Sequence, residues 1–213
     1  YDSIRGGGDL SDIYDRNQWN PKIGITWNPV PDTTIRAAAF RVLKRDLINS
    51  ATLEPTQVAG FTQFFDDAAS TDTWTYGIGV DQKFLPTLFG GLALSYRDMS
   101  VPVIFLGSTI SSSRVDWTEN LGRAYMYWAP HRWFGLNAEY QYEKVNRDWE
   151  FTFGVKDMTT QRLPLGAVFY HPSGFSAMVK ATYYNQQGTF RLPNAPEGPE
   201  NFVDDSEKFW LCD

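Results

Sequence analysis

The chain holds only two histidines, His131 and His171, the side chains best suited to moving a proton near neutral pH. A hydrolase would need one of them beside a serine nucleophile and an Asp or Asn. Each histidine instead sits in a Pro-containing tight turn next to an expected strand end, opposite the long polar loops. We therefore expect both to be turn residues, and we expect the protein not to be an enzyme.

Acidic side chains are the remaining candidates for a metal site. Asp9, Asp12 and Asp15 could offer carboxylates to calcium, but their spacing does not match an EF-hand loop. The acidic pairs Asp66–Asp67 and Asp204–Asp205 are most simply residues that keep loops soluble. We expect no metal site and no cofactor.

Composition excludes several further classes. Gly77 and Gly79 alone do not make a glycine-rich nucleotide-binding motif, and no helix is expected to follow them. A single cysteine, Cys212, excludes intrachain disulfides and thiolate zinc sites. The 19 Lys and Arg against 25 Asp and Glu give a net charge of -6, so no nucleic-acid partner is expected. An aromatic content of 16% excludes a disordered chain.

Large apolar residues alternate with small or charged ones along several segments, which is the period of a β-strand. In residues 74–83, one face holds Trp74, Tyr76, Ile78 and Val80. The same alternation recurs in residues 92–97, 134–143 and 175–184. A helical stripe would need apolar residues three and four apart, which these segments lack. The sequence therefore predicts an all-β protein.

The connections between the alternating segments are of two kinds. Tight turns containing proline are expected at residues 28–32, 85–87, 129–132 and 171–174. Long polar connections are expected at residues 46–55, 101–114, 146–157 and 188–207. Short turns at one end and long loops at the other are typical of an outer-membrane barrel, whose short turns face the periplasm.

The predicted fold class is an antiparallel up-and-down transmembrane β-barrel, with about ten strands visible, as part of a larger barrel. The expected strands are residues 22–27, 34–44, 58–66, 74–84, 89–99, 114–128, 133–147, 159–170, 175–189 and 208–213. No run of about 18 apolar residues predicts a transmembrane helix. Residues 1–17 are expected to form a loop and residues 18–213 the strand meander of one outer-membrane segment, with no plug domain. The abrupt start at Tyr1 leads us to expect a fragment or a mature internal segment.

The polar faces of these strands are the candidate functional surface. A charge on the lipid face near the membrane midplane costs about 2 to 4 kcal/mol, so charged residues are expected to point into the lumen. The lumen-facing candidates are Asp81, Lys83, Arg97, Arg123, Glu139, Gln141, Glu143 and Lys180. Two roles remain open for them: a lattice of ion pairs that stiffens the wall or seats a plug, or direct contact with solute.

Several segments, taken in order, resemble the C-terminal barrel half of TonB-dependent-receptor-like outer-membrane proteins, some of which carry tetratricopeptide repeats. The segments are residues 20–29, 34–41, 53–61, 121–128, 162–166 and 171–174. The resemblance implies a monomeric barrel in the bacterial outer membrane, among membrane lipid and lipopolysaccharide. It also implies solute uptake energised from the inner membrane, through a periplasmic energising protein or a larger membrane complex. The chain shows no plug, no TonB-box-like segment and no final strand ending in an aromatic residue.

Two other functions stay open at this point. One is a passive or export pore, or a scaffold barrel, attached to periplasmic repeats. The other is a soluble β-sandwich binding module, in which the aromatic residues would form a core or a platform for sugars. A plug with a TonB box in the preceding sequence would support uptake, and tandem helical repeats would support the scaffold.

Overall fold

The computed structural model of the 213-residue chain contains only β-strands as regular elements in the part that it describes. The described residues are 2–4, 16–44, 57–62, 67–106, 110–147, 154–192 and 201–212. The prediction of an all-β protein is confirmed. Across these ranges, no helix is long and apolar enough to cross a membrane.

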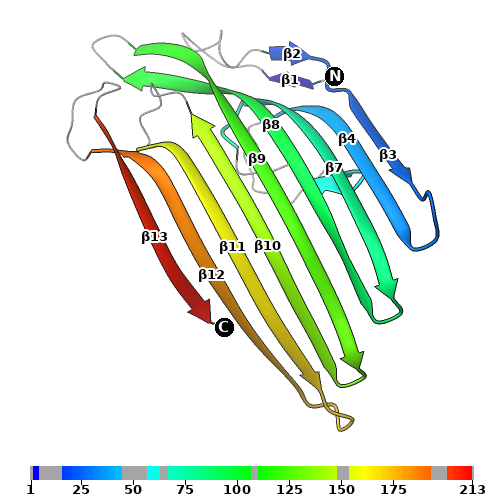
Figure 1. The fold of residues 1–213 in the computed structure, drawn as a ribbon. Coiled ribbons are helices and arrows are strands. Elements are labelled where there is room, and N and C mark those ends of the chain that lie inside the picture. The colour runs from blue at the N-terminus through cyan, green and yellow to red at the C-terminus, as the bar shows by residue number, and fades with distance from the viewer. Residues whose placement is uncertain are drawn as a thin grey trace.

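Nine strands form one large antiparallel sheet (Figure 1). They are β3 (Lys22–Trp27), β4 (Thr33–Leu43), β7 (Asp72–Leu85), β8 (Leu88–Leu106), β9 (Ile110–His131), β10 (Phe134–Arg147), β11 (Val155–Tyr170), β12 (Ser176–Arg191) and β13 (Phe202–Cys212). Their order in the sheet follows their order in the chain, so the sheet is an up-and-down meander. Strands β3 and β13 are its two edges, and over the described residues the sheet does not close on itself.

The predicted wall strand at residues 58–66 is wrong, so the large sheet has nine strands where ten were expected. The chain there forms a separate hairpin of β5 (Gln57–Val58) and β6 (Phe61–Thr62). The two residues between these strands have positive φ angles, 48° at Ala59 and 82° at Gly60. Positive φ at both central positions favours a tight reversal of the chain, which prevents a continuous strand. Residues 63–66, with Asp66, lie outside the described part.

The predicted long connection at residues 101–114 is also wrong. Strands β8 and β9 stay paired from Leu88 opposite Trp128 to Leu106 opposite Ile110. Strand β7 pairs with β8 only as far as Ser100, so Pro102 lies where β8 has a single neighbour and a missing N–H is tolerated. The sequence predicted a loop here because proline and serine, which this segment contains, are common in turns.

The other long connections are shorter than expected, because their flanking strands extend further. The connection predicted at residues 146–157 runs from the end of β10 at Arg147 to the start of β11 at Val155. The connection predicted at residues 188–207 runs from the end of β12 at Arg191 to the start of β13 at Phe202. The connection predicted at residues 46–55 lies outside the described residues.

The expected loop at residues 1–17 contains strands. Strand β1 (Asp2–Ile4) pairs antiparallel with β2 (Arg16–Gln18) in a small sheet of its own. Asp2 lies opposite Gln18 and Ile4 opposite Arg16. The candidates Asp9, Asp12 and Asp15 lie outside the described residues. Short polar strands of this kind show no alternation that a sequence pattern could detect.

The tight turns lie where proline predicted them. Between β3 and β4, the amide of Thr33 donates to the carbonyl of Val30 at 3.3 Å, and Asp32 has a φ of 64°. Pro31 therefore occupies the second position of a turn whose third residue has positive φ, a type II arrangement that proline favours. All four of these short turns lie at one end of the sheet (Figure 1).

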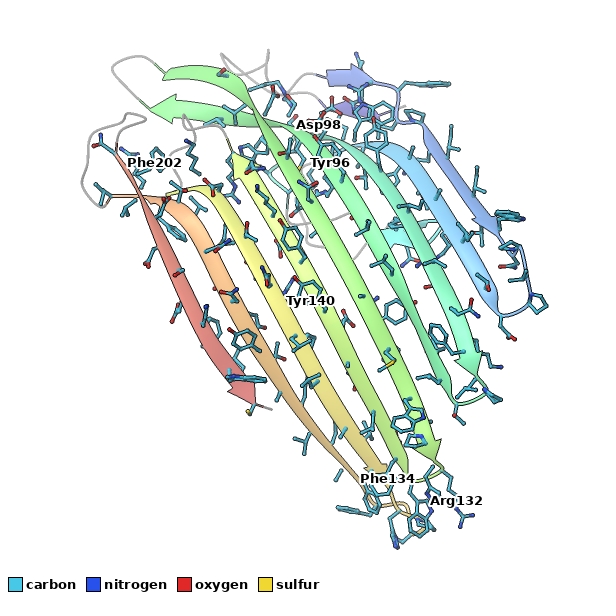
Figure 2. The ribbon with its side chains drawn as sticks, in the orientation of Figure 1. Tyr96, Asp98, Arg132, Phe134, Tyr140 and Phe202 are labelled. Atoms are coloured by element: carbon cyan, nitrogen blue, oxygen red, sulfur yellow. The ribbon has the colours of Figure 1, made fainter. Side chains whose placement is uncertain are left out.

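The two faces of the sheet differ in chemistry along most of its strands. Strand β13 is an exception, because Asp204 and Lys208 share a face with Trp210 while Phe209 and Leu211 lie on the other. One face, called here the apolar face, holds one large or small apolar residue from each strand in a row across the sheet: Trp27, Ile35, Val80, Leu92, Ala124, Tyr140, Leu163, Tyr183 and Trp210. The opposite face, the polar face, holds Thr26, Arg36, Gly79, Ala93, Arg123, Gln141, Arg162, Tyr184 and Phe209. Figure 2 shows Tyr96 near the loop end of the sheet, Tyr140 midway along it and Phe134 at the short-turn end.

Burial in this sheet is the reverse of that in a water-soluble sheet. On the apolar face Ile25 is 62% exposed, Ile78 57% and Leu94 48%. On the polar face Arg97 is only 4% exposed. The buried apolar side chains of the sheet lie mainly on the polar face as well, in two clusters built on Phe40 and Val101.

The length of β8 and β9 can be tested without substitutions. Because amides in cross-strand hydrogen bonds exchange slowly, we expect the amides of residues 101–106 and 113–119 that face the partner strand to be protected like those of residues 90–96. The measurement is hydrogen–deuterium exchange followed by mass spectrometry. Complete exchange of residues 101–106 within seconds, as in a loop, would contradict the long hairpin.

Candidate functional site

The register of the strands places all eight predicted lumen-facing residues on the polar face. Arg97 lies directly opposite Glu119, and Arg123 lies opposite Gln141. Two of the eight, Lys83 and Lys180, fall in one cross-strand row, which runs from Lys83 through Phe89, Tyr127, Asn137 and Gly166 to Lys180. The sequence alternation therefore grouped them correctly by face. Arg123, Glu139 and Gln141 bond to one another, and the other partners come from residues outside the eight.

A first cluster joins three strands of the polar face. The Arg36 guanidinium on β4 donates to Asp81 on β7, with Nε 2.6 Å from Oδ2 and Nη2 3.3 Å from Oδ1. The hydroxyl of Tyr125 on β9 also donates to Asp81. Asp81 thus holds strands β4 and β9 together across β8, with Gly91 directly opposite it and too small to intervene. Arg36 and Tyr125 were not among the sequence candidates.

A second cluster continues along the same face. Arg123 binds Glu139 through two hydrogen bonds, of 2.6 Å from Nε and 2.8 Å from Nη2. The amide of Gln141 donates to the same carboxylate at 2.5 Å. Paired bonds of this geometry fix both side chains in orientation as well as in place. One strand further on, Arg162 reaches Glu143 at 3.2 Å.

A third cluster lies nearer the loop end and is the most buried. Arg97 donates to Glu119 from Nη1 and to Asp67 from Nη2, each at 2.5 Å. The exposed fraction of the Arg97 side chain is 5%, and those of Glu119 and Asp67 are 12% and 15%. Buried charges cost free energy unless they are paired, so these three side chains depend on one another.

The β5–β6 hairpin lies against the polar face, close to the first cluster. Arg36 donates from Nη1 to the carbonyl of Ala59 at 3.1 Å, and its guanidinium lies over the Phe61 ring, 5.4 Å from the ring centroid. Phe61 packs onto Gly77 of β7 so closely that a Cβ there would lie 2.5 Å from the ring. Arg36 therefore binds the hairpin and the wall at the same time.

The short-turn end of the polar face carries the two lysines. Within the described part of the chain, neither Lys83 nor Lys180 has a carboxylate within ion-pair distance. Between them in their row, the rings of Phe89 and Tyr127 stack with centroids 5.1 Å apart. This end of the polar face thus presents separated positive charges beside aromatic rings.

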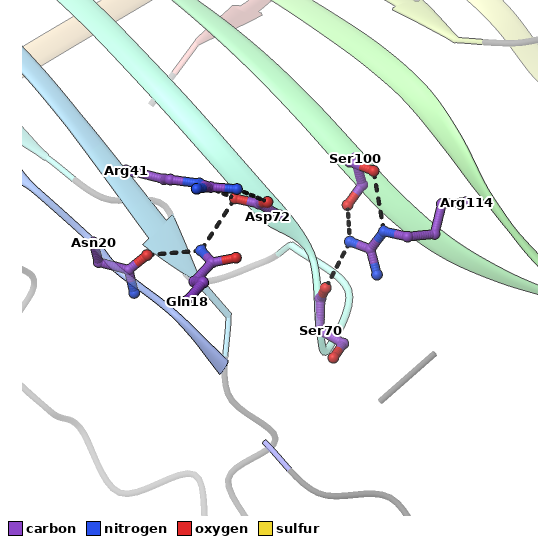
Figure 3. Close-up of polar contacts among 7 residues, drawn as sticks. All are labelled: Gln18, Asn20, Arg41, Ser70, Asp72, Ser100 and Arg114. Carbon is purple, nitrogen blue, oxygen red and sulfur yellow. Dashed lines mark hydrogen bonds and ion pairs between the residues drawn. The ribbon is translucent and has the colours of Figure 1, made fainter. Parts of the chain in front are cut away.

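The apolar face ends toward the loops at a group of polar contacts (Figure 3). Arg41 binds Asp72 through bonds of 2.9 and 2.6 Å, and Gln18 donates to the same carboxylate at 3.1 Å. Arg114 donates to Ser100 Oγ at 3.0 Å and to the carbonyl of Ser70 at 2.9 Å. These groups define where the apolar surface stops on β4, β7, β8 and β9.

The histidines are exposed at the short-turn end of the sheet: His131 is the last residue of β9, and His171 directly follows β11. His131 Nδ1 accepts the amide of Trp133 at 3.3 Å, and His171 Nδ1 lies 2.7 Å from the Ser173 hydroxyl. Within the described ranges, neither imidazole bonds to a carboxylate, and no group of three or more His, Cys, Asp or Glu could hold a metal ion. What the polar face offers chemically is fixed charge and hydrogen bonding.

Comparisons with protein-family models, with curated proteins and with solved structures give no significant match to this chain. The likeness to TonB-dependent receptors therefore stays a prediction from the sequence.

The Arg97 cluster yields a test of stability. Replacing Arg97 by Met leaves two buried carboxylates without their cation, and we expect the free energy of unfolding to fall by about 3 to 5 kcal/mol. The matched control is Arg162→Met, which removes a longer and more exposed pair and should cost about 1 kcal/mol or less. The measurement is a denaturant titration followed by tryptophan fluorescence. Equal losses in the two variants would contradict the role given to the Arg97 cluster.

The hairpin yields a second test. Arg36→Gln removes a charge-assisted hydrogen bond worth about 1.5 to 3 kcal/mol, so the amides of residues 57–62 should exchange about ten to a hundred times faster. The control is Arg123→Gln, on the same face with no contact to the hairpin. If both variants leave exchange at residues 57–62 unchanged, Arg36 does not hold the hairpin.

Proposed function

We propose that the chain forms part of the wall of an outer-membrane transport barrel, with the apolar face against lipid and the polar face toward a water-filled lumen. The observation that carries this proposal is the reversed burial of the sheet. Large apolar side chains remain exposed on one face of eight of the nine strands, all except β4, while ion pairs are buried on the other face. Such a face is costly in water and stable in a bilayer.

The extent of the apolar face supports the proposal. On β10 it runs from Phe134 to Tyr142, and on β8 from Leu88 to Tyr96, in each case nine residues, or eight steps along the strand. At about 3.4 Å per residue this is about 27 Å along a strand. A strand that is tilted in the membrane needs roughly 9 to 11 residues to cross, so the two lengths agree.

Aromatic side chains lie at both limits of the apolar face. Toward the loops, Trp74 stacks on Tyr76, which in turn stacks on Tyr96, with centroids 5.9 and 6.5 Å apart. At the short-turn end, Trp128 and Phe134 are 44% and 47% exposed. Two bands of aromatic residues separated by aliphatic ones are typical of barrels at the two membrane interfaces.

The soluble β-sandwich is disfavoured by how the sheet is covered. A sandwich needs a second sheet over the apolar face of the first. In the described part of the chain, the β5–β6 hairpin overlies the polar face, and Gln18 of β2 meets the apolar face at its loop margin, on Asp72. A barrel closes instead by adding strands to the open edges β3 and β13.

Uptake of a polar solute is the transport function that the polar face favours. Its ion pairs stiffen the wall, and the hairpin bound by Arg36 narrows the passage beside β4 and β7. The likeness to TonB-dependent receptors supports energised uptake, with the long-loop end outside the cell. The proposed surroundings are outer-membrane lipid and lipopolysaccharide, and the proposed partner is a periplasmic energising protein or a larger membrane complex.

Neighbouring residues on opposite faces provide the test. In the full-length protein with Cys212 replaced by Ser, single cysteines are introduced at Leu94 and Leu136 on the apolar face and at Ser95 and Asn137 on the polar face. In outer-membrane vesicles, a water-soluble maleimide should label the polar-face cysteines at least about tenfold faster than the apolar-face ones, because a thiol in lipid stays protonated and out of reach. Equal labelling, or a protein found in the aqueous fraction, would contradict the proposal.

A further inference from the structure

A groove of about 460 Å³ crosses the apolar face toward its loop end. It lies over β4 and over β7 to β10, from Ala38 to Tyr142, and its side walls come from Tyr76, Ile78, Leu94, Tyr96, Asn120 and Tyr142. All six side chains lie on the apolar face by register. The groove is therefore separate from the charged clusters on the other side of the sheet.

Gly122 leaves space for the groove, because this residue has no side chain. It lies between Leu94 on β8 and Tyr142 on β10, which are its direct cross-strand partners. A Cβ at Gly122 would meet Leu94 and Tyr142 at 3.4 and 3.6 Å, which is ordinary contact, so a small side chain would fit there. The absence of a side chain at this point leaves a hollow between two large neighbours.

The walls change in polarity along the strands. The row toward the short turns contains Ile78 and Leu94, which are aliphatic. The next row toward the loops contains Tyr76, Tyr96 and Asn120, which carry hydroxyl and amide groups. Hydrocarbon contacts thus lie deeper in the proposed membrane, and hydrogen-bonding groups lie nearer its outer surface.

A positive charge extends this gradient. Lys144 lies directly opposite Asn120 on β10, at the outer margin of the groove. The nearest acidic residue on the same face is Asp157 on β11, which lies opposite Asn146 and diagonally from Lys144 on the side toward the loops. Among the described residues, Lys144 forms no ion pair with it. An anionic group above the groove would therefore meet the Lys144 ammonium.

We propose that this groove binds one acyl chain of a lipopolysaccharide molecule in the outer leaflet. The inference rests on the proposed function, which places the apolar face in the outer membrane and the long loops outside. The chain lies over Gly122 between Leu94 and Tyr142, the ester and hydroxyl groups of the lipid meet Asn120 and the tyrosine hydroxyls, and a lipid phosphate meets Lys144. An amphipathic anion matches both the polarity gradient and the charge of this site.

The test compares two substitutions on one strand. Gly122→Phe fills the groove, and Ala124→Phe places the same ring on the same face outside the groove lining. The full-length protein is purified from outer membranes in a mild detergent, and bound lipid is identified by native mass spectrometry. We expect the wild-type protein and Ala124→Phe to retain one lipopolysaccharide, and Gly122→Phe to lose about tenfold in occupancy, or about 1.4 kcal/mol.

A second variant covers the case in which Gly122→Phe fails to assemble. Asn120→Leu removes the polar end of the groove without filling its floor, and it should also lower lipopolysaccharide occupancy. Retention of lipopolysaccharide by every folded variant, or a phospholipid or a protein in its place, would overturn the groove proposal while leaving the cysteine-labelling pattern intact. A protein absent from the outer membrane would instead overturn the proposed function.

Discussion

The structure depends on one constraint: a single sheet has an apolar face and a polar face, and each needs a matching environment. In a water-soluble protein, burial of apolar surface stabilises by about 25 cal/mol per Å², and a sheet gains it by packing its apolar face on another layer. Here Ile25, Ile78 and Leu94 point away from the rest of the chain, and the clusters around Phe40 and Val101 form on the other side. A surrounding bilayer would supply the missing layer, and the reversed sheet would then be stable as a wall.

The polar face follows from the same constraint. Charged side chains that share one face of a sheet lie within reach of their cross-strand neighbours, so they pair with one another. Arg97 does so with two carboxylates, and Asp81 receives bonds from Arg36 and Tyr125. Arg36 also binds the hairpin, so the position of the hairpin and the link between β4 and β7 depend on one guanidinium. Loss of that guanidinium would affect both.

Much of the fold could be predicted from the sequence, because period-2 alternation determines which side chains share a face. That pattern correctly grouped residues as distant as Asp81 and Lys180, and proline located the short turns. It could not show which residues pair. Register decides that Glu119 meets Arg97, and a chain reversal at Ala59 and Gly60 brings the hairpin to Arg36. Arg36 could have been found by extending the alternation through β4, since it shares a face with Phe40.

The central claim is that the apolar face contacts lipid, and photolabelling from within the bilayer tests it most directly. The full-length protein is reconstituted in vesicles that contain a membrane-confined carbene precursor, and the labelled residues are identified by mass spectrometry. The reversed-sheet account predicts labels on Ile25, Ile78, Leu94, Leu136 and Leu165, with none on Thr75, Leu121 or Thr182 of the polar face. Labels distributed equally over both faces, or absent from both, would contradict it.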